Sequence, residues 1–276
     1  FLAVAESGSF SQASHQLHVT QPAVTKRIKA LEQLLGVQVF DRVGKRVFLT
    51  QAGEVLQRQA EQMLAMLQDT ERQLRNLSDA VTGELRMATS HHIGLHRLAP
   101  VLRAFTSTYP DVQLNLSFED SEVAHGMARQ GEIELAVVTL NPAGDPYLQY
   151  AEVWQDPLVF TGSGQLQGAY TMQELAELPC VLPGMNTYTG RIVSQRFAEA
   201  GIALQPTMST NYLETIGMLV SVGLGWSVLP RSMLGDLHLL EVDCPAMTRT
   251  LGCVTNPQRA MSNAAQAFVE VLDQHA

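Results

Sequence analysis

A serine and three histidines lie close together in the sequence, at Ser90, His91, His92 and His96. A serine beside a histidine could act as a nucleophile with its base, and two histidines four residues apart on a helix could bind one metal ion. No carboxylate or cysteine stands nearby in the sequence to complete a metal site. We therefore predict no catalytic or metal centre here, and we interpret His91 and His92 as polar lining of a ligand pocket or as solvent-exposed side chains.

The sequence lacks the motifs of several common enzyme classes. It contains no GxSxG turn of hydrolases, no GxxxxGK[ST] phosphate loop and no GxGxxG dinucleotide fingerprint. Its three cysteines, Cys180, Cys244 and Cys253, are odd in number and lack CxxC spacing, so we expect them to be reduced and structural. We predict that the chain is not an enzyme.

A second group of polar side chains lies on a predicted helix that begins at Gln21-Pro22. Its apolar residues recur at helical spacing and form an inward stripe of Val24, Ile28, Leu31 and Leu35. The outward and flanking positions carry Gln21, Thr25, Lys26 and Lys29. Amide, hydroxyl and ammonium groups on one helical face are typical of a helix that reads base edges in the DNA major groove.

Short elements with clear boundaries surround this helix. Gly8 ends a helix, and Ser9 and Gln12 fit a capping box for a helix that starts near Phe10. After Gly36, two predicted strands over 37–40 and 47–49 flank a basic turn over 41–46. These elements predict a winged helix-turn-helix over residues 1–49. A solvated basic helix in an interaction module is the alternative.

The charge distribution supports a polyanionic partner for the N-terminal part only. The whole chain has a net charge of −9 over 276 residues. Residues 1–58 carry seven Lys or Arg against four acids, whereas residues 83–276 carry nine against nineteen. Such an asymmetry indicates that the first segment contacts nucleic acid and that the remainder has another task.

The segment over 50–82 predicts a long linker helix. Its residues 56, 60, 63, 67, 70, 74, 77 and 81 are apolar, except for Thr70, and are spaced alternately by four and three. A helix of about 29 residues, from Thr50 to about Ser78, would extend about 43 Å at about 1.5 Å per residue, too far to fold back on a small N-terminal domain. We predict that its apolar edge pairs with the same helix of a second subunit; packing on its own chain is the alternative.

Strands and helices alternate from residue 83 onward. A βαβαβ series, with strands over 84–89, 113–119 and 135–138, predicts a parallel sheet, and a second series occupies 158–254. A final amphipathic helix over 262–274 could return to the first series. We predict an α/β two-lobed domain over 83–276, with the first lobe at 83–156 and 257–276 and the second at 157–256.

The N-terminal motifs closely resemble those of the LysR-type transcriptional regulators. The resemblance is carried by Phe1–Ser14, Leu17, Thr20–Glu32, Leu35-Gly36, Phe40-Asp41-Arg42 and Leu49–Gly53. The family more often has Ser at the position of Thr25. The resemblance implies a periplasmic-binding-protein-like effector domain behind a winged helix-turn-helix and a linker helix. It also implies a homodimer, and the homotetramer that is usual in the family.

Two sets of site residues follow from the helix pattern and this resemblance. We expect DNA contacts from the recognition helix and the wing, with base edges read by Gln21 and Lys26 and phosphates bound by basic side chains. The expected DNA-binding residues are Gln21, Pro22, Thr25, Lys26, Arg27, Lys29, Arg42, Lys45 and Arg46. The expected effector-binding residues are Ser90, His91, His92, Asn186, Thr187, Asn211 and Tyr212. They lie where predicted strands end and helices begin, and an N-cap role alone is the alternative for Ser90.

We therefore expect a cytoplasmic regulator that binds double-stranded promoter DNA and is switched by a small polar metabolite between two lobes. We expect no cofactor and no membrane partner, since no run approaches the roughly 18–20 apolar residues of a bilayer span and no leader pattern is present. RNA polymerase is a further partner if the protein activates transcription. The alternatives are a redox- or metal-responsive regulator and, third, an α/β enzyme with a DNA-binding head.

Overall fold

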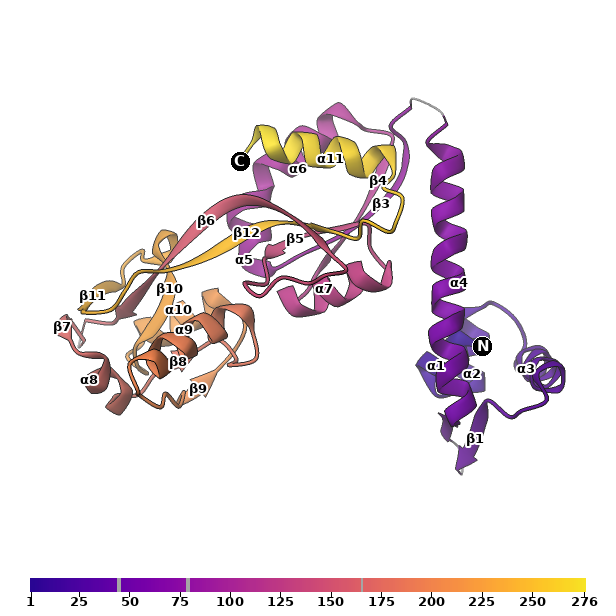
Figure 1. Ribbon diagram of the computed structural model, residues 1–276, viewed down its shortest axis with the longest axis horizontal. Helices are drawn as coiled ribbons and strands as arrows, with labels where there is room; N and C mark the ends of the chain where they lie inside the picture. Colours follow the sequence, from indigo (N-terminus) through magenta and orange to yellow (C-terminus); the bar gives the residue numbers. More distant parts are fainter. Residues whose placement is uncertain (44–45, 78–79, 165) are drawn as a thin grey trace. The chain divides into compact units, whose positions relative to one another are not determined.

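The computed structural model describes residues 1–43, 46–77, 80–164 and 166–276. Its internal contacts divide the chain into two compact units, Phe1–Glu71 and Arg72–Ala276. We describe each unit by itself, with the element labels of Figure 1. No helix among the described residues is long and apolar enough to cross a membrane.

The N-terminal unit begins with three helices and a hairpin. These elements are α1 (Leu2–Ser7), α2 (Phe10–Gln16), α3 (Gln21–Leu35), β1 (Phe40–Val43) and β2 (Arg46–Leu49). The helices are as predicted, but the first hairpin strand is Phe40–Val43 and not the expected 37–40, so most of the expected turn over 41–46 belongs to the strands. The Ser9 side chain caps α2 by accepting a hydrogen bond from the backbone N–H of Gln12. Gly36 ends α3 in a left-handed conformation, which a residue with a Cβ adopts only with strain.

A small apolar core holds the three helices against the hairpin. Its buried members are Val4, Phe10, Ala13, Val24, Ile28, Val39 and Phe40. The stripe predicted for α3 is therefore confirmed at its first two positions, whereas Leu35 is exposed because α3 extends beyond this core. The packing fixes the orientation of α3 and so determines which of its side chains face solvent.

The linker helix α4 (Gln51–Arg75) is 25 residues long. Gly53, in its first turn, lies so close to the carbonyl of Val39 that an added Cβ would be 2.1 Å from that oxygen. Many apolar side chains of α4 are exposed to solvent in the single chain: Val55, Met63, Leu64, Met66, Leu67 and Leu74. A single chain therefore leaves much of the apolar surface of this helix uncovered.

The first lobe of the second unit contains the predicted parallel βαβαβ arrangement. Its strands are β3 (Gly83–Thr89), β4 (Val112–Phe118) and β5 (Leu135–Thr139), and β3 pairs in parallel with both of the others. Its helices are α5 (His91–Ile93), α6 (Ala99–Thr108), α7 (Ser121–Gln130) and α11 (Asn263–Gln274). Leu85, Phe105 and Phe268 belong to a core that joins β3, α6 and α11, and Figure 1 shows these two helices side by side.

The helix after β3 starts earlier than the sequence predicts and contains a π-helical segment, Gly94–Leu98. The apolar pattern over 95–108 predicts a helix that begins at Leu95, whereas the chain is helical from His91. Pro100 lies in the first turn of α6 and has no N–H to donate to the carbonyl of His96. The missing hydrogen bond accounts for the irregular turn that carries His96.

The second lobe is built around a second core, which includes Phe160, Phe197 and Trp226. Its helices are α8 (Met172–Glu177), α9 (Tyr188–Glu199), α10 (Leu213–Ser221) and a 3₁₀ turn over Arg231–Met233. Its strands are β7 (Gly168–Tyr170), β8 (Val181–Leu182), β9 (Met208–Ser209), β10 (Ser227–Pro230) and β11 (His238–Val242). The sequence pattern predicts a strand over 204–209, but only Met208–Ser209 forms one.

Two long antiparallel strands, β6 (Gln149–Gly162) and β12 (Met247–Thr255), connect the lobes (Figure 1). They complete a mixed sheet with the strand order β4-β3-β5-β12-β6-β11-β7, to which β10 is added beside β6. Residues 251–255 of β12 pair with β5 of the first lobe. We expected the second lobe to end at residue 256. The strand pairing places residues 251–255 in the sheet of the first lobe instead.

Candidate functional site

The exposed face of α3 carries most of the residues that we expect to bind DNA. Gln21, Pro22, Lys26, Arg27 and Lys29 are exposed, and Thr25 is partly buried at its edge. The side-chain amide of Gln21 donates a hydrogen bond to the hydroxyl of Thr25 at 3.1 Å. Because these residues are one helical turn apart, Thr25 holds the Gln21 amide in place on the helix surface.

The remaining predicted DNA contacts fall in the hairpin. Arg42 lies on β1 and Arg46 on β2, and the antiparallel pairing of Val43 with Arg46 closes the two strands toward the turn. Lys45 lies outside the described residues. The hairpin therefore has the backbone geometry of a wing, but Arg42 and Arg46, which we expected in its turn, lie on its two strands.

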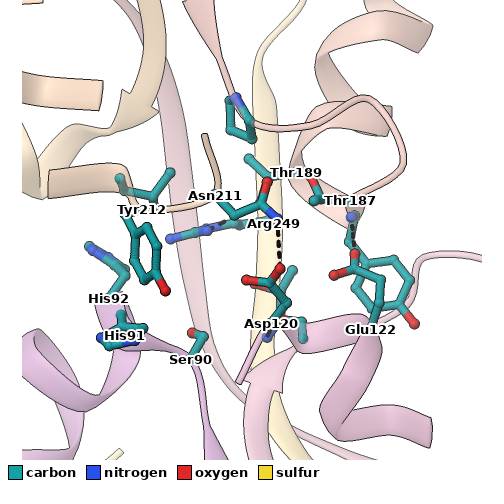
Figure 2. A pocket seen from close by; sticks show the side chains of 15 residues that line it. Ser90, His91, His92, Asp120, Glu122, Thr187, Thr189, Asn211, Tyr212 and Arg249 are labelled. Carbon is teal, nitrogen blue, oxygen red and sulfur yellow. Dashed lines mark hydrogen bonds between the residues drawn. The ribbon is translucent and has the colours of Figure 1, made fainter. Parts of the chain in front are cut away.

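A cavity of about 510 Å³, which includes space open to solvent, lies between the two lobes of the second unit. It is lined by Ser90, His91, His92, Asp120, Ser121, Glu122, Thr139, Pro183, Thr187, Tyr188, Thr189, Asn211, Tyr212, Leu213 and Arg249. Six of the seven predicted effector-binding residues are among them; Asn186 is exposed and does not line the cavity. Figure 2 shows residues of both lobes facing one another across it.

Helix beginnings provide the polar groups of this cavity. Ser90 is the N-cap residue of α5, and its side chain makes no capping hydrogen bond. Thr187 caps α9 by accepting a hydrogen bond from the N–H of Gly190 at 3.0 Å, and it donates to the carbonyl of Gly184 at 2.7 Å. Thr187 thus has a clear structural role, whereas the Ser90 hydroxyl remains available for a ligand.

Two carboxylates of the first lobe reach the second lobe. The amide of Asn211 donates to Asp120 at 2.6 Å, and its oxygen accepts from the N–H of Gly184 at 3.1 Å. Glu122 accepts a hydrogen bond from the N–H of Tyr188, in the first turn of α9 (Figure 2). Burial raises the pKa of Glu122. These contacts hold the lobes together across the cavity, and sequence patterns did not single out either acid.

A buried ion pair forms the back of the cavity. Arg249 on β12 and Asp156 on β6 face each other in register, with Nε of Arg249 donating to Oδ2 of Asp156 at 2.8 Å. Arg249 also donates to the hydroxyl of Thr189 at 3.2 Å. Sequence reasoning missed both charges, because only the pairing of strands 93 residues apart brings them together.

His92 is the most unusual of the predicted residues. It is 4% exposed, and neither ring nitrogen has a hydrogen-bond partner among the described residues. Burial, with smaller contributions from Arg249 and His96, lowers the pKa of His92 to about 4, although Glu214 opposes this shift. The imidazole is therefore neutral at neutral pH.

Glu214 provides the carboxylate that the sequence around His92 lacks. It comes from α10 of the second lobe, and its Oε1 lies 3.5 Å from Nδ1 of His92 and 3.1 Å from Nε2 of His96. His91 makes ring contacts with Phe118 and, across the lobes, with Tyr212. No carboxylate is close to these histidines along the sequence, but Glu214 is close to His92 and His96 in space.

The cysteines have the character of structural residues. Cys180 and Cys253 are buried and Cys244 is partly buried. Burial raises the pKa of all three thiols, that of Cys253 to about 12. The reactive thiolate form is therefore disfavoured at each of them.

Comparisons with known proteins identify both parts of the chain. Residues 1–54 match the family described as "Bacterial regulatory helix-turn-helix protein, lysR family". Residues 78–276 match the family described as "LysR substrate binding domain". An HTH-type transcriptional regulator from the ibpB-leuC intergenic region of Azotobacter vinelandii is 60% identical over 100 residues, 36% of this chain and 69% of that protein.

Solved structures share the fold. The full-length CbnR in complex with its target DNA has a TM-score of 0.69 at 22% identity, covering 99% of this chain and 96% of that one. The effector binding domain of QuiR in complex with shikimate has a TM-score of 0.62 at 16% identity, covering 70% of this chain and 96% of that one. The two family matches, together with the helix-turn-helix and the two-lobed domain described above, lead to one assignment: the chain belongs to the LysR family of transcriptional regulators.

Proposed function

We propose that this regulator binds promoter DNA through the exposed face of α3 and the hairpin, and that a small polar metabolite in the cavity between the lobes controls that binding. Residues 1–49 contact DNA, the linker over 50–82 mediates dimerisation through its helix α4 (Gln51–Arg75), and residues 83–276 respond to the effector. The protein acts in the cytoplasm as a dimer, which associates further into a tetramer. It contacts RNA polymerase if it activates transcription.

The observation that carries the proposal is that both lobes contribute polar side chains to one cavity. Ser90 and His91 come from the first lobe, and Asn211 and Tyr212 from the second. A ligand that contacts both groups binds the closed arrangement more tightly than an open one, and only such a difference in affinity can shift the equilibrium. The same coupling requires that DNA binding change the affinity for the effector by an equal factor.

The side chains of the cavity favour a ligand with several polar groups. Donors come from Ser90 and Arg249, whereas Asp120 and Glu122 are acceptors. The QuiR domain, which shares this fold, was solved with shikimate, a small polyhydroxylated acid. We propose an effector of similar size and polarity.

The DNA-binding part is tested by Lys26→Ala, with Arg103→Ala as the control. Both residues are exposed cations, but Arg103 lies on α6 of the first lobe. After genome-wide mapping of the bound sites, the affinity of the purified chain for one such site is measured at several salt concentrations. We expect Lys26→Ala to weaken binding and, if it contacts phosphate, to reduce the salt slope by about one. Equal affinities for both variants would contradict the assigned surface.

The effector part is tested by Ser90→Ala. Metabolites of the pathway encoded beside the bound sites are screened by calorimetry against the purified chain. For a metabolite that binds, we expect Ser90→Ala to abolish its effect on DNA affinity and to leave DNA binding without effector unchanged. A normal response in this variant would remove Ser90 from the site.

A further inference from the structure

We propose that His92, His96 and Glu214 form a binding site for a divalent transition-metal ion, which links the first lobe to the second. This inference goes beyond the proposed function, because it adds a second ligand next to the effector cavity. It rests on the positions of three side chains, on the buried and unpaired state of one of them, and on a second carboxylate behind it.

The three side chains are already close to a metal-binding arrangement. Their ligand atoms all lie within 4.8 Å of one another. Four ligands around Zn²⁺, each about 2.0–2.1 Å from the ion, are separated by about 3.3 Å in a tetrahedron. The two distances from Glu214, 3.5 Å to His92 and 3.1 Å to His96, are near this value. Only the two imidazoles must approach each other, by at most about 1.5 Å.

The burial of His92 is the second observation. A buried polar group without a partner carries a substantial desolvation cost, and native proteins rarely leave one. Both ring nitrogens of His92 are in this state among the described residues. The nearest acceptor, Oε1 of Glu214, is 3.5 Å from Nδ1, and a metal ion between them would give this nitrogen a direct bonding partner.

A carboxylate stands behind His92 on the side away from Glu214. Oδ2 of Asp156 lies 4.0 Å from Nε2 of His92, and Arg249 holds this carboxylate in place. Histidines that bind metals usually direct their other ring nitrogen at a carboxylate or a carbonyl, which orients the ring. Asp156 can take this role after a small rotation of the imidazole.

The helix that carries the histidines is irregular at this position. His96 lies in the π-helical segment Gly94–Leu98, and such segments occur frequently at functional sites. The ring centroids of His92 and His96 are 4.8 Å apart, and the ring planes are inclined at 41° to each other. The wider turn places two histidines next to Glu214 on a helix that begins at the wall of the effector cavity.

The ligand set determines the class of metal. Two imidazoles and one carboxylate suit Zn²⁺, Co²⁺, Ni²⁺ or Fe²⁺, whereas Mg²⁺ and Ca²⁺ prefer sites made only of oxygen atoms. Since the histidines belong to the first lobe and Glu214 belongs to the second, the ion is bound fully only when the lobes are together. Metal binding therefore stabilises the closed arrangement.

The test measures Zn²⁺ binding to the full chain by calorimetry, after removal of metals with a chelator. The variants are His96→Ala and Glu214→Gln, whose side chains are partly exposed, because replacement of the buried His92 could prevent folding. The control is His238→Ala, an exposed histidine on β11. Circular dichroism confirms that each variant is folded.

We expect one tight Zn²⁺ per chain in the parent and in the control. Each ligand variant should weaken it at least about 100-fold, which exceeds the roughly 10- to 100-fold loss typical of outer-shell residues. Co²⁺ should develop visible absorption bands in the parent that both variants lose, and Mg²⁺ should not compete. The proposal is overturned if the parent binds no Zn²⁺, or if both variants bind it as the control does. Neither result would affect the DNA-binding assignment, which the Lys26 variant tests separately.

Discussion

Asp156 and Arg249 face each other across two strands with side chains that are 1% and 5% exposed. Removing one partner of a buried ion pair leaves the other charge without compensation. We expect Asp156→Asn to lower the free energy of unfolding of the second unit by roughly 3–5 kcal/mol. Denaturant titration followed by tryptophan fluorescence measures this change, because Trp154 and Trp226, the only two tryptophans, are both in this unit.

An exposed ion pair in the same unit provides the control. Arg86 and Glu84 are 3.1 Å apart, and the side chain of Arg86 is 46% exposed. Exposed pairs contribute about 0–1 kcal/mol, so Arg86→Ala should have little effect. Similar losses in both variants would show that the buried position of Asp156 is not what makes it important.

His125 makes the stability of the second unit depend on pH. Its Nδ1 lies 2.6 Å from the carbonyl of Ser121, its Nε2 has no partner among the described residues, and burial lowers the pKa of the imidazole from 6.5. Above pH 6.5 the ring is neutral whether the chain is folded or unfolded. As the pH falls below this value, the unfolded chain binds a proton that the folded chain excludes, so stability is lost.

We expect the free energy of unfolding to decrease as the pH falls through 6.5, and His125→Gln to reduce this decrease. Urea titrations at a series of pH values, with a chelator present, measure both slopes. Identical slopes in the parent and in the variant would assign the pH dependence to other groups.

The sequence predicted the cavity residues that follow the ends of strands. It did not predict the site residues that come close only through the packing of distant segments. Ser90, Thr187 and Asn211 line the cavity as expected, since the start of a helix is a local signal. Arg249 and Glu214 could not be found in this way. Their roles depend on the register of β12 with β6 and on the approach of α10 to α5, which no local pattern encodes.

At the scale of elements, helices and strands with a clear apolar periodicity were predicted from the sequence. Strands whose side chains are mostly exposed to solvent were not. The three parallel strands of the first lobe and the helix α11 were predicted because each buries an apolar face. The first half of β6, over 149–156, was missed. Most of its side chains are exposed or partly exposed, so it lacks the apolar run that marks a buried strand.

Gly53 allows α4 to lie close to the segment that precedes β1. A Cβ there would lie 2.1 Å from the carbonyl oxygen of Val39, which is backbone and cannot rotate away. We expect Gly53→Ala to destabilise the N-terminal unit by about 1–3 kcal/mol, despite the higher helix propensity of alanine. Amide hydrogen exchange measures the loss as reduced protection of α1–α3.

Gly126 is the matched control for this substitution. It is also a helical glycine, in α7, but an added Cβ would meet no atom within 4 Å. Gly126→Ala should stabilise its helix by about 0.5–1 kcal/mol. A loss of protection in this variant as large as that in Gly53→Ala would show that helical glycines are sensitive here for a reason other than space.

At the scale of the whole molecule, the apolar side chains of α4 are the basis for predicting self-association. Leu67 lies on the seam of four- and three-residue steps and is 57% exposed in the single chain. We expect Leu67→Lys to weaken dimerisation by more than about tenfold, since burying one leucine contributes roughly 1.5–3 kcal/mol. Sedimentation equilibrium measures the dissociation constant.

The control for this prediction is Gln62→Lys, at an exposed position off the seam. It adds the same charge to the same helix and should leave the dimer intact. Equal weakening by both substitutions would point to charge repulsion, and no effect of either would place the dimer contact elsewhere.

The two strands that connect the lobes also determine how the lobes can separate. β6 and β12 are hydrogen-bonded neighbours, with a bulge at Leu251–Gly252. A Cβ on Gly252 would lie 2.2 Å from the carbonyl oxygen of Ala151. A bulge interrupts the ladder locally, and the strand that contains it bends and twists more strongly there. Because both lobes are attached to this ribbon, we expect any separation of the lobes to bend it near Leu251–Gly252.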